Sequence, residues 1–216
     1  MKPSKPFFRT CLKIASGILL LVFALGSLLY SCAPVRPGIP ALIPAYPGGV
    51  RSFLGASMHK YDSMKGSFEF TLENENGRRV SAEAVAVVRP ENVRVSIYHT
   101  GMLVGNLEDL AEKRGLDYEV YREALQKALL WWALGGYETR DLPGAVMVTS
   151  GDLRLVLAAR TYVPVGETIC MAGGDLVVTY SDYRPVGGFW YPFRIGMEYH
   201  GARLDLRANH IELAHS

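Results

Sequence analysis

The chain has 216 residues, enough for one domain with a buried core and a leader segment in front of it. Four of its 23 Lys and Arg residues lie in the first 13 positions, which contain no Asp or Glu. The rest of the chain therefore has 19 basic and 21 acidic residues, which gives it a formal charge of about −2. No basic run with interleaved aromatic residues occurs. The composition therefore argues against a nucleic-acid partner.

The first feature in chain order is a leader over residues 1–31. Its basic positions are followed by eighteen uncharged, mostly apolar residues, 14–31, and then by Cys32, which is the order of a secretory signal. Leu29, Tyr30 and Ser31 ahead of Cys32 resemble a bacterial lipobox and predict cleavage before Cys32 and acylation of its thiol, for example by palmitate. Two alternatives stay open, namely simple secretion and a retained membrane anchor, because a spanning helix needs about 20 apolar residues.

Residues 32–49 are predicted to form a tether. Five of the twelve prolines of the chain lie between Ala33 and Gly49, and such segments favour extended conformations of roughly 3 Å per residue. The tether would hold a folded domain, residues 50–216, away from a bilayer. Ala33 is not the aspartate that resembles an inner-membrane retention signal, which by analogy favours the inner leaflet of the outer membrane, facing the periplasm.

The hydrophobic period predicts a helix in front of a sheet. The helix is expected over residues 49–64, where apolar residues recur at helical spacing at Val50, Phe53, Leu54, Met58 and Tyr61. The period changes to two over residues 66–88, with an Asn76-Gly77 turn between two strands. A third strand is expected over residues 93–98, followed by "HTG" and a short apolar "MLVGNL".

Two helices then interrupt the strands, one over 107–115 and a clearer one over 121–136 that ends at Gly135-Gly136. Strand patterns resume and continue to the C-terminus. Strands in meander order with one apolar face form an antiparallel sheet, and that face must be covered. The sequence thus predicts an α+β domain in which about nine strands form a curved antiparallel sheet around a small helical layer.

Motifs for catalysis, metals or cofactors are missing from the sequence. The five histidines form no H-E-x-x-H pair, and neither a G-x-S-x-G elbow nor a Walker loop is present. Cys170, alone in the predicted domain, is interpreted as a small buried apolar residue. We therefore expect a protein that is not an enzyme and needs no metal or cofactor. Its large supply of aromatic and methionine residues predicts instead an apolar groove for a lipid tail.

Taken in order, these segments resemble the LolA/LolB family of lipoprotein carriers and receptors, with the LolB branch the more similar. The resemblance covers most of residues 32–214 and rests on the lipobox cysteine, the tether, "GSFEF", "NVRVSIYHTGMLVGNLE", "ALLWWALGG" and the closing "DLVVTYSDY" to "ARLDLRANHIEL". It implies a half-open barrel of eleven strands with lid helices and a cavity for acyl chains. It also implies delivery of lipoproteins from a periplasmic LolA-like carrier to the outer membrane, into which LolB inserts them.

In that receptor a protruding leucine precedes the glycine of the loop after the third strand. Thr100 takes this place ahead of Gly101, and Met102 and Leu103 follow directly. Met102 and Leu103 are therefore predicted to form the membrane-contacting loop. This departure from the pattern bears on the insertion step.

The favoured interpretation is a monomeric, lipid-anchored envelope chaperone that shelters acyl chains of lipids or lipoproteins. Its cavity is expected to be lined by Phe68, Phe70, Val95, Ile97, Trp131, Trp132, Phe193, Ile195 and Met197. The main alternative is a non-catalytic accessory lipoprotein of an envelope complex, with a filled core. A third, an envelope enzyme, would require polar groups clustered in the cleft.

Overall fold

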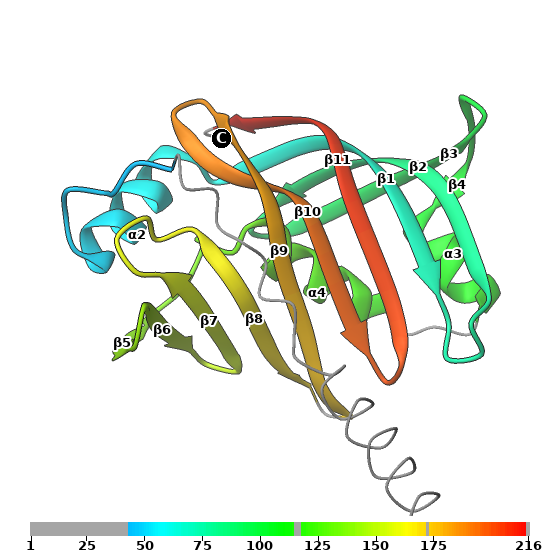
Figure 1. The fold of residues 1–216 in the computed structure, drawn as a ribbon. Helices are drawn as coiled ribbons and strands as arrows, with labels where there is room; N and C mark the ends of the chain where they lie inside the picture. Colours follow the sequence, from blue (N-terminus) through cyan, green and yellow to red (C-terminus); the bar gives the residue numbers. More distant parts are fainter. Residues whose placement is uncertain (1–42, 115–117, 172, 215–216) are drawn as a thin grey trace, which may run out of the picture. The chain divides into compact units, whose positions relative to one another are not determined.

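The structure is a computed structural model that describes residues 43–114, 118–171 and 173–214. The leader, Cys32 and the first part of the predicted tether lie outside the described residues. Helix α2 (Val50–Lys60) comes before the sheet, and α3 (Leu107–Arg114) and α4 (Tyr118–Leu129) interrupt the series of strands (Figure 1). A helix in front of the sheet and a helical insertion were predicted, but with other bounds. Helix α2 ends at Lys60, so that Met64 belongs to β1, and α4 ends at Leu129, ahead of the expected stop at Gly135-Gly136.

The strands are β1 (Ser63–Glu73), β2 (Arg79–Arg89), β3 (Asn92–His99), β4 (Met102–Asn106), β5 (Glu138–Leu142), β6 (Ala145–Ser150), β7 (Leu153–Ala158), β8 (Pro164–Met171), β9 (Gly174–Val186), β10 (Phe189–Tyr199) and β11 (Ala202–Ala214). Together they form one eleven-stranded sheet in the order β4-β3-β2-β1-β11-β10-β9-β8-β7-β6-β5. Neighbouring strands are antiparallel throughout.

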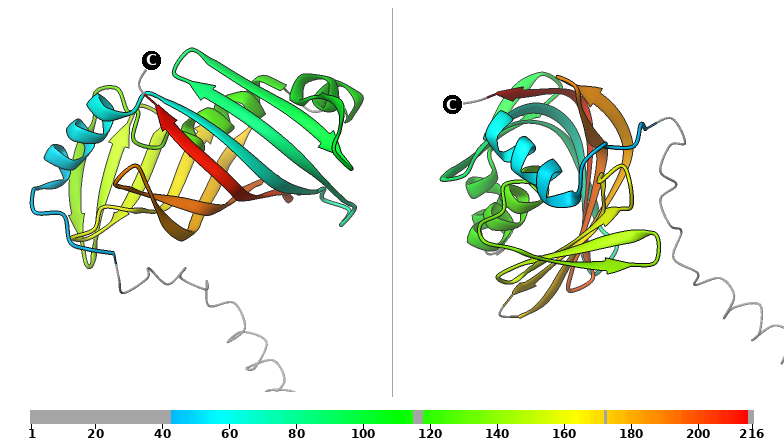
Figure 2. Two further views of the ribbon diagram at one scale, coloured as in Figure 1. Left: turned by 90° about the horizontal axis from the view of Figure 1, so that it is seen from above. Right: turned by 90° about the vertical axis from the view of Figure 1, so that its left-hand side faces the viewer.

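One pairing departs from the meander, because the first strand pairs with the last. In the register of β1 and β11, Phe68 lies opposite Ala208 and Leu72 lies opposite Leu204. Strands β4 and β5 are the two edges and do not pair with each other, so the barrel stays half open. The sheet curves around α4 and the end of α2 (Figure 2). The predicted fold class, a curved antiparallel sheet with a few helices inside it, is therefore confirmed.

The number of strands exceeds the nine expected from the sequence. Strand β5 has the sequence "ETRDL", which lacks an alternating apolar face, and β4 is a short edge strand. Edge strands are solvated along one side and carry little hydrophobic signal. The polar composition of β5 explains why its pattern was not recognised as a strand.

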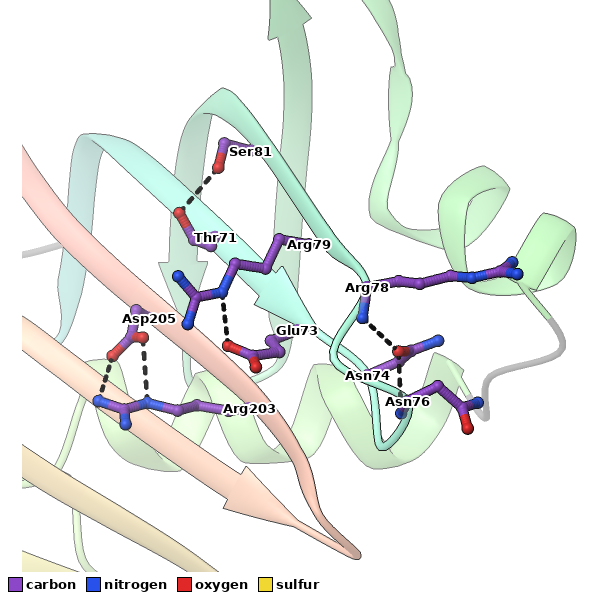
Figure 3. Close-up of polar contacts among 9 residues, drawn as sticks. All are labelled: Thr71, Glu73, Asn74, Asn76, Arg78, Arg79, Ser81, Arg203 and Asp205. Atoms are coloured by element: carbon purple, nitrogen blue, oxygen red, sulfur yellow. Dashed lines mark hydrogen bonds and ion pairs between the residues drawn. The ribbon is translucent and has the colours of Figure 1, made fainter.

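The Asn76-Gly77 turn between β1 and β2 is as predicted. The Oδ1 atom of Asn74 accepts hydrogen bonds from the backbone N–H groups of Asn76 (3.1 Å) and Arg78 (2.9 Å) (Figure 3). Gly77 has a φ of 73°, a conformation that glycine adopts without steric cost. The outer face of the sheet beside this turn is polar, and its ion pairs include Arg79 with Glu73 and Arg203 with Asp205 (Figure 3).

The core lies between the concave face of the sheet and the helices. Helix α4 buries an apolar stripe against the sheet that consists of Ala124, Leu125, Ala128 and Leu129. Along β10, Ile195 and Met197 are buried, whereas Arg194 and Glu198 are exposed. This alternation is the period of two from which the strand was predicted.

The last residues of the predicted tether pack against the domain. Ile43 is buried, and the backbone N–H of Tyr46 donates a hydrogen bond of 2.7 Å to the carbonyl oxygen of Arg160, in the turn after β7. The ring of Tyr46 packs edge-on against Phe53 of α2, with 5.2 Å between ring centroids. The packed part of the chain therefore includes Ile43–Gly49, ahead of the expected domain boundary at residue 50.

Candidate functional site

A small apolar cavity lies between the concave face and the helices α3 and α4. Its lining consists only of apolar residues from β1, β2, β3, β11 and the two helices: Phe68, Phe70, Ala84, Ala86, Val95, Ile97, Leu107, Leu125, Leu129, Leu204 and Leu206. Its volume is about 40 Å³. Since one water needs roughly 10–15 Å³ by this measure, the cavity as described is far too small for an acyl chain.

Four of the nine predicted cavity residues line this space, namely Phe68, Phe70, Val95 and Ile97. The alternation in β1 and β3 was the signal that located them. Three further lining residues belong to the helices and were not predicted to line the cavity, namely Leu107, Leu125 and Leu129. Their helical spacing was visible in the sequence, but which part of the sheet they would cover depends on tertiary packing.

The remaining five predicted residues lie elsewhere in the core. Trp131 and Trp132 are fully buried just after α4 and pack at 87° to each other, with 5.5 Å between ring centroids. Ile195 is buried, and Met197 belongs to the packed core near Tyr121. The guanidinium carbon of Arg184 lies 4.6 Å from the ring centroid of Phe193. None of these five side chains lines the 40 Å³ cavity.

The C-terminal end of α4 is fixed to the sheet by hydrogen bonds. The last carbonyl groups of a helix lack intrahelical donors. The Tyr191 hydroxyl donates to the Leu129 carbonyl oxygen at 2.9 Å, and the Tyr180 hydroxyl lies 3.2 Å from the Ala128 carbonyl oxygen. All of these groups are buried, so their hydrogen bonds fix where the helix ends relative to β9 and β10.

Glu167 is a buried carboxyl group beneath this end of α4. Its Oε2 atom lies 2.5 Å from the Tyr180 hydroxyl, and its Oε1 atom has no hydrogen-bond partner among the described residues. Burial raises the pKa of Glu167 to about 7, although the hydrogen bond from Tyr180 and the charge of Lys127 oppose this shift. Glu167 is therefore largely protonated in mildly acidic solution.

The tip between β3 and β4 is apolar and exposed. Met102, Leu103 and Val104 are 66%, 64% and 56% exposed. Thr100 and Gly101 both have positive φ, of 51° and 78°, which is the geometry of a two-residue hairpin turn that matches the twist of the strands. Met102 and Leu103 were predicted to form a membrane-contacting loop. They instead begin the edge strand β4, directly after the Thr100-Gly101 turn. Val104 extends the tip, and an exposed apolar run of this kind typically marks a membrane or protein contact.

Three further features concern metal ligands, membrane-spanning helices and the free cysteine in the part of the chain that the structure describes. The described residues contain no cluster of three or more His, Cys, Asp and Glu side chains placed to hold a metal ion. In the same residues, no helix combines the length and the apolar character needed to cross a bilayer. Cys170 has a free thiol and is half-buried, which makes it more accessible than predicted.

No protein-family model matches the sequence, and no curated protein matches it. The chain is similar to several solved structures, three of which are crystal structures from bacteria. A domain from Vibrio parahaemolyticus, assigned provisionally to outer membrane lipoprotein sorting, is 8% identical, with a TM-score of 0.48 over 76% of this chain and 90% of its own. A LolA superfamily protein from Nitrosomonas europaea is 11% identical, with a TM-score of 0.46 over 78% and 95%.

The third is a DUF1329 family protein from Desulfovibrio piger, which is 10% identical, with a TM-score of 0.44 over 75% of this chain and 89% of its own. At these identities the likeness concerns the fold alone. The strand order and the position of the helices by themselves define a half-open antiparallel barrel with helices on its concave face. This is the architecture that the resemblance to the LolA/LolB family predicted. A closer assignment to LolB stays a prediction.

Proposed function

We propose that this protein is a lipid-anchored envelope carrier or receptor that binds acyl chains between its concave sheet and the helices α3 and α4. The observation that carries the proposal is the lining of the cavity, in which β1, β2, β3, β11 and both helices present only apolar side chains. A hydrocarbon chain needs no polar partner. A surface that consists only of apolar side chains is suited to binding a hydrocarbon chain and not a polar ligand.

Binding requires the helical cover to move, because the cavity of about 40 Å³ cannot hold an acyl chain. Exposing Leu107 and Leu125, which lie on the part of the cover that would move, would cost about 1.5–3 kcal/mol each, or roughly 3–6 kcal/mol together. A sixteen-carbon chain taken from water gains up to about 12 kcal/mol at about 0.8 kcal/mol per CH₂ group. The gain exceeds the cost, so opening driven by the ligand is energetically feasible.

The hydrogen bonds of α4 suggest where the cover would pivot. Its C-terminal end is held by the phenols of Tyr180 and Tyr191, and the Trp132 indole N–H just after the helix donates to the Tyr61 carbonyl oxygen at 2.8 Å. Among the described residues that line the cavity, the cover contributes only leucine side chains. Beside the cavity, the Gln126 side-chain amide also donates a hydrogen bond to the Pro90 carbonyl oxygen between β2 and β3. We infer that α3 and the first turns of α4 move outward while the end of α4 stays in place.

The finer part of the proposal is delivery to the outer membrane. An acyl group on Cys32 would anchor the chain, and stable anchoring takes more than one acyl chain or a second membrane contact. The exposed tip of Met102, Leu103 and Val104 would supply a second contact and a path for the cargo into the bilayer. The cargo would be a lipid or a lipoprotein, received from a periplasmic LolA-like carrier.

Photocrosslinking tests the binding site directly. The full chain, reconstituted in phosphatidylcholine vesicles, would be offered a diacylated lipopeptide that carries a diazirine in one acyl chain. We expect cross-links on β1, β3 and α4, and their loss in Phe68→Glu, which places a carboxylate in the cavity. Ser67→Glu is the matched control, because it introduces the same group one residue away, on the other side of the strand.

Folding of each variant would be checked by circular dichroism, and the wild-type cross-link map decides the question even if Phe68→Glu does not fold. Absence of cross-links from the concave face of a folded wild-type protein would refute the proposal. The chain would then be a tethered accessory protein with a filled core.

A further inference from the structure

A second apolar space lies at the other end of the helical layer, and we call it the α2 groove. It has a volume of about 370 Å³ and lies between the segment before α2, α2 itself, the β7–β8 loop and the β9–β10 turn. Figure 2 shows α2 and the segment before it beside the yellow-green strands at this end of the sheet. Unlike the 40 Å³ cavity, the α2 groove falls within the range of about 300–1,000 Å³ typical of small-molecule sites.

The walls of the α2 groove are mainly apolar. Phe53 and Phe189 stack in parallel with 6.0 Å between ring centroids, and Trp190 and Val163 complete this side. On the opposite side, the segment before α2 contributes Pro44, Ala45, Tyr46 and Pro47. Prolines have a fixed φ, so this wall loses little conformational freedom when a ligand binds.

An aromatic layer separates the α2 groove from the 40 Å³ cavity. Trp131 is fully buried and stacks on Phe189 at 5.5 Å and on Phe53 at 6.2 Å between ring centroids. Neither tryptophan after α4 lines the groove or the cavity. The two spaces share no lining residue, so a ligand in one need not enter the other.

Two polar groups belong to residues that line the α2 groove. The Lys60 ammonium group donates a hydrogen bond of 3.0 Å to the Gly187 carbonyl oxygen, and two of its three N–H donors stay available for a ligand. The Oγ1 atom of Thr161 is shielded from solvent and has no hydrogen-bond partner among the described residues. None of the described residues that line the groove is acidic. The charge at its rim is therefore positive.

We propose that the α2 groove binds one fatty acid, with its carboxylate beside the Lys60 ammonium group and its hydrocarbon chain against Phe53, Phe189 and Trp190. A carboxylate supplies the negative charge and the acceptor atoms that Lys60 lacks. The chain needs only apolar contacts. A single-chain anionic amphiphile fits this combination better than a neutral lipid, which would leave the rim charge unpaired, or a protein, which needs a broad interface.

This site is distinct from the proposed acyl-chain cavity, and it can be tested separately. The full chain in phosphatidylcholine vesicles would be labelled with palmitate that carries a diazirine, and the cross-linked peptides identified by mass spectrometry. We expect labels on α2 and on residues 188–190. Ala56→Trp fills the groove from the exposed side of α2 and should remove these labels, while lipopeptide cross-links to β1, β3 and α4 remain.

The contribution of the charge would be measured with brominated palmitate, which quenches the fluorescence of a nearby tryptophan such as Trp190. We expect Lys60→Gln to weaken binding about fivefold, as for a partly exposed ion pair, and to leave binding of the brominated methyl ester unchanged. Arg51→Gln, on the same helix but outside the groove, is the matched control. Equal losses in the two variants would contradict a specific role of Lys60.

Labels that are absent from α2 and residues 188–190, or that persist in Ala56→Trp, would overturn the proposal. A third outcome would also overturn it. If only Cys32→Ala protein takes up the palmitate probe at this site, the groove is already filled in the wild-type chain by the acyl group on Cys32, and its occupant is not a free fatty acid. Failure of the lipopeptide cross-links alone would refute the proposed function and leave the α2 groove proposal standing.

Discussion

The hydroxyl of Tyr180 lies 2.5 Å from Oε2 of Glu167 and 3.2 Å from the carbonyl oxygen of Ala128, and so connects a buried carboxyl group to the end of helix α4. A phenol has one proton to donate. When Glu167 is protonated, it can donate to Tyr180, whose own proton is then free for Ala128. When Glu167 is ionised, the Tyr180 proton goes to the carboxylate and the Ala128 carbonyl loses its donor.

This relationship predicts a pH-dependent stability. The folded-state pKa of Glu167, about 7, is above its ordinary value of 4.5, so the folded protein binds more protons than the unfolded chain between these pH values. Its contribution is fully present below about pH 4.5 and is lost as the pH rises through about 7. The loss amounts to about 3 kcal/mol at 1.36 kcal/mol per pKa unit.

Urea unfolding followed by tryptophan fluorescence at pH 5 and pH 8 would measure this loss. Glu167→Gln should remove most of the difference, because an amide does not ionise in this range. The control Glu83→Gln, at an exposed position of β2, should keep it. A wild-type free energy of unfolding that is equal at the two pH values would show that Glu167 does not titrate in this window.

Tyr191→Phe should destabilise the protein. The change leaves the buried Leu129 carbonyl oxygen without the 2.9 Å hydrogen bond that it accepts from the phenol, at a cost of about 1–3 kcal/mol. Tyr137→Phe is the comparison, because no hydrogen bond of that hydroxyl is found among the described residues. Equal unfolding free energies for Tyr191→Phe and the wild type would argue against a fixed end of α4.

Leu125→Ala is expected to have opposite effects on stability and on binding. Removing this side chain enlarges the 40 Å³ cavity and should cost about 2–5 kcal/mol of stability. It also lowers the cost of opening the cover, so the acylated lipopeptide should bind more tightly. Denaturant titration and lipopeptide titration on the same preparation would measure both. Weaker binding together with lower stability would contradict a cover that opens.

The exposed tip should matter for transfer and not for folding. Replacing Leu103, which is 64% exposed, with Asp should change stability by no more than about 0.5 kcal/mol. Transfer of the lipopeptide from the protein to acceptor vesicles should become slower, because a carboxylate does not enter the hydrocarbon region. Thr100→Asp in the adjacent turn is the control. Unchanged transfer rates in Leu103→Asp would remove the tip from the proposal.

Cys32→Ala tests the anchor. If the thiol is acylated, the wild-type chain takes up labelled palmitate in cells and fractionates with the outer membrane, whereas the variant does neither. Cys11→Ala, within the leader, is the matched control and should behave like the wild type. Label that persists in Cys32→Ala would exclude the lipobox interpretation and favour one of the two alternatives for the leader.

Local patterns in the sequence were sufficient for most of the fold. The alternation along β1, β3 and β10, the Asn76-Gly77 turn and the helical period before the sheet depend on neighbours within a few residues, and all three were predicted. The polar strand β5 was missed because an edge strand needs no apolar face. The apolar tip at Met102 and Leu103 was expected from the resemblance to the LolA/LolB family, not from a local pattern.

Tertiary structure alone decided how the concave face is filled. The pairing of β1 with β11 brings Phe68 and Leu206, far apart in the chain, to one cavity, and it places Leu125 and Leu129 over them. The composition indicated an excess of apolar side chains. It did not indicate which of them would fill the concave face, because close packing depends on how side chains from distant segments fit together in the folded protein. The α2 groove and the contact between Glu167 and Tyr180 likewise join residues from distant segments, and no local pattern in the sequence marks either of them.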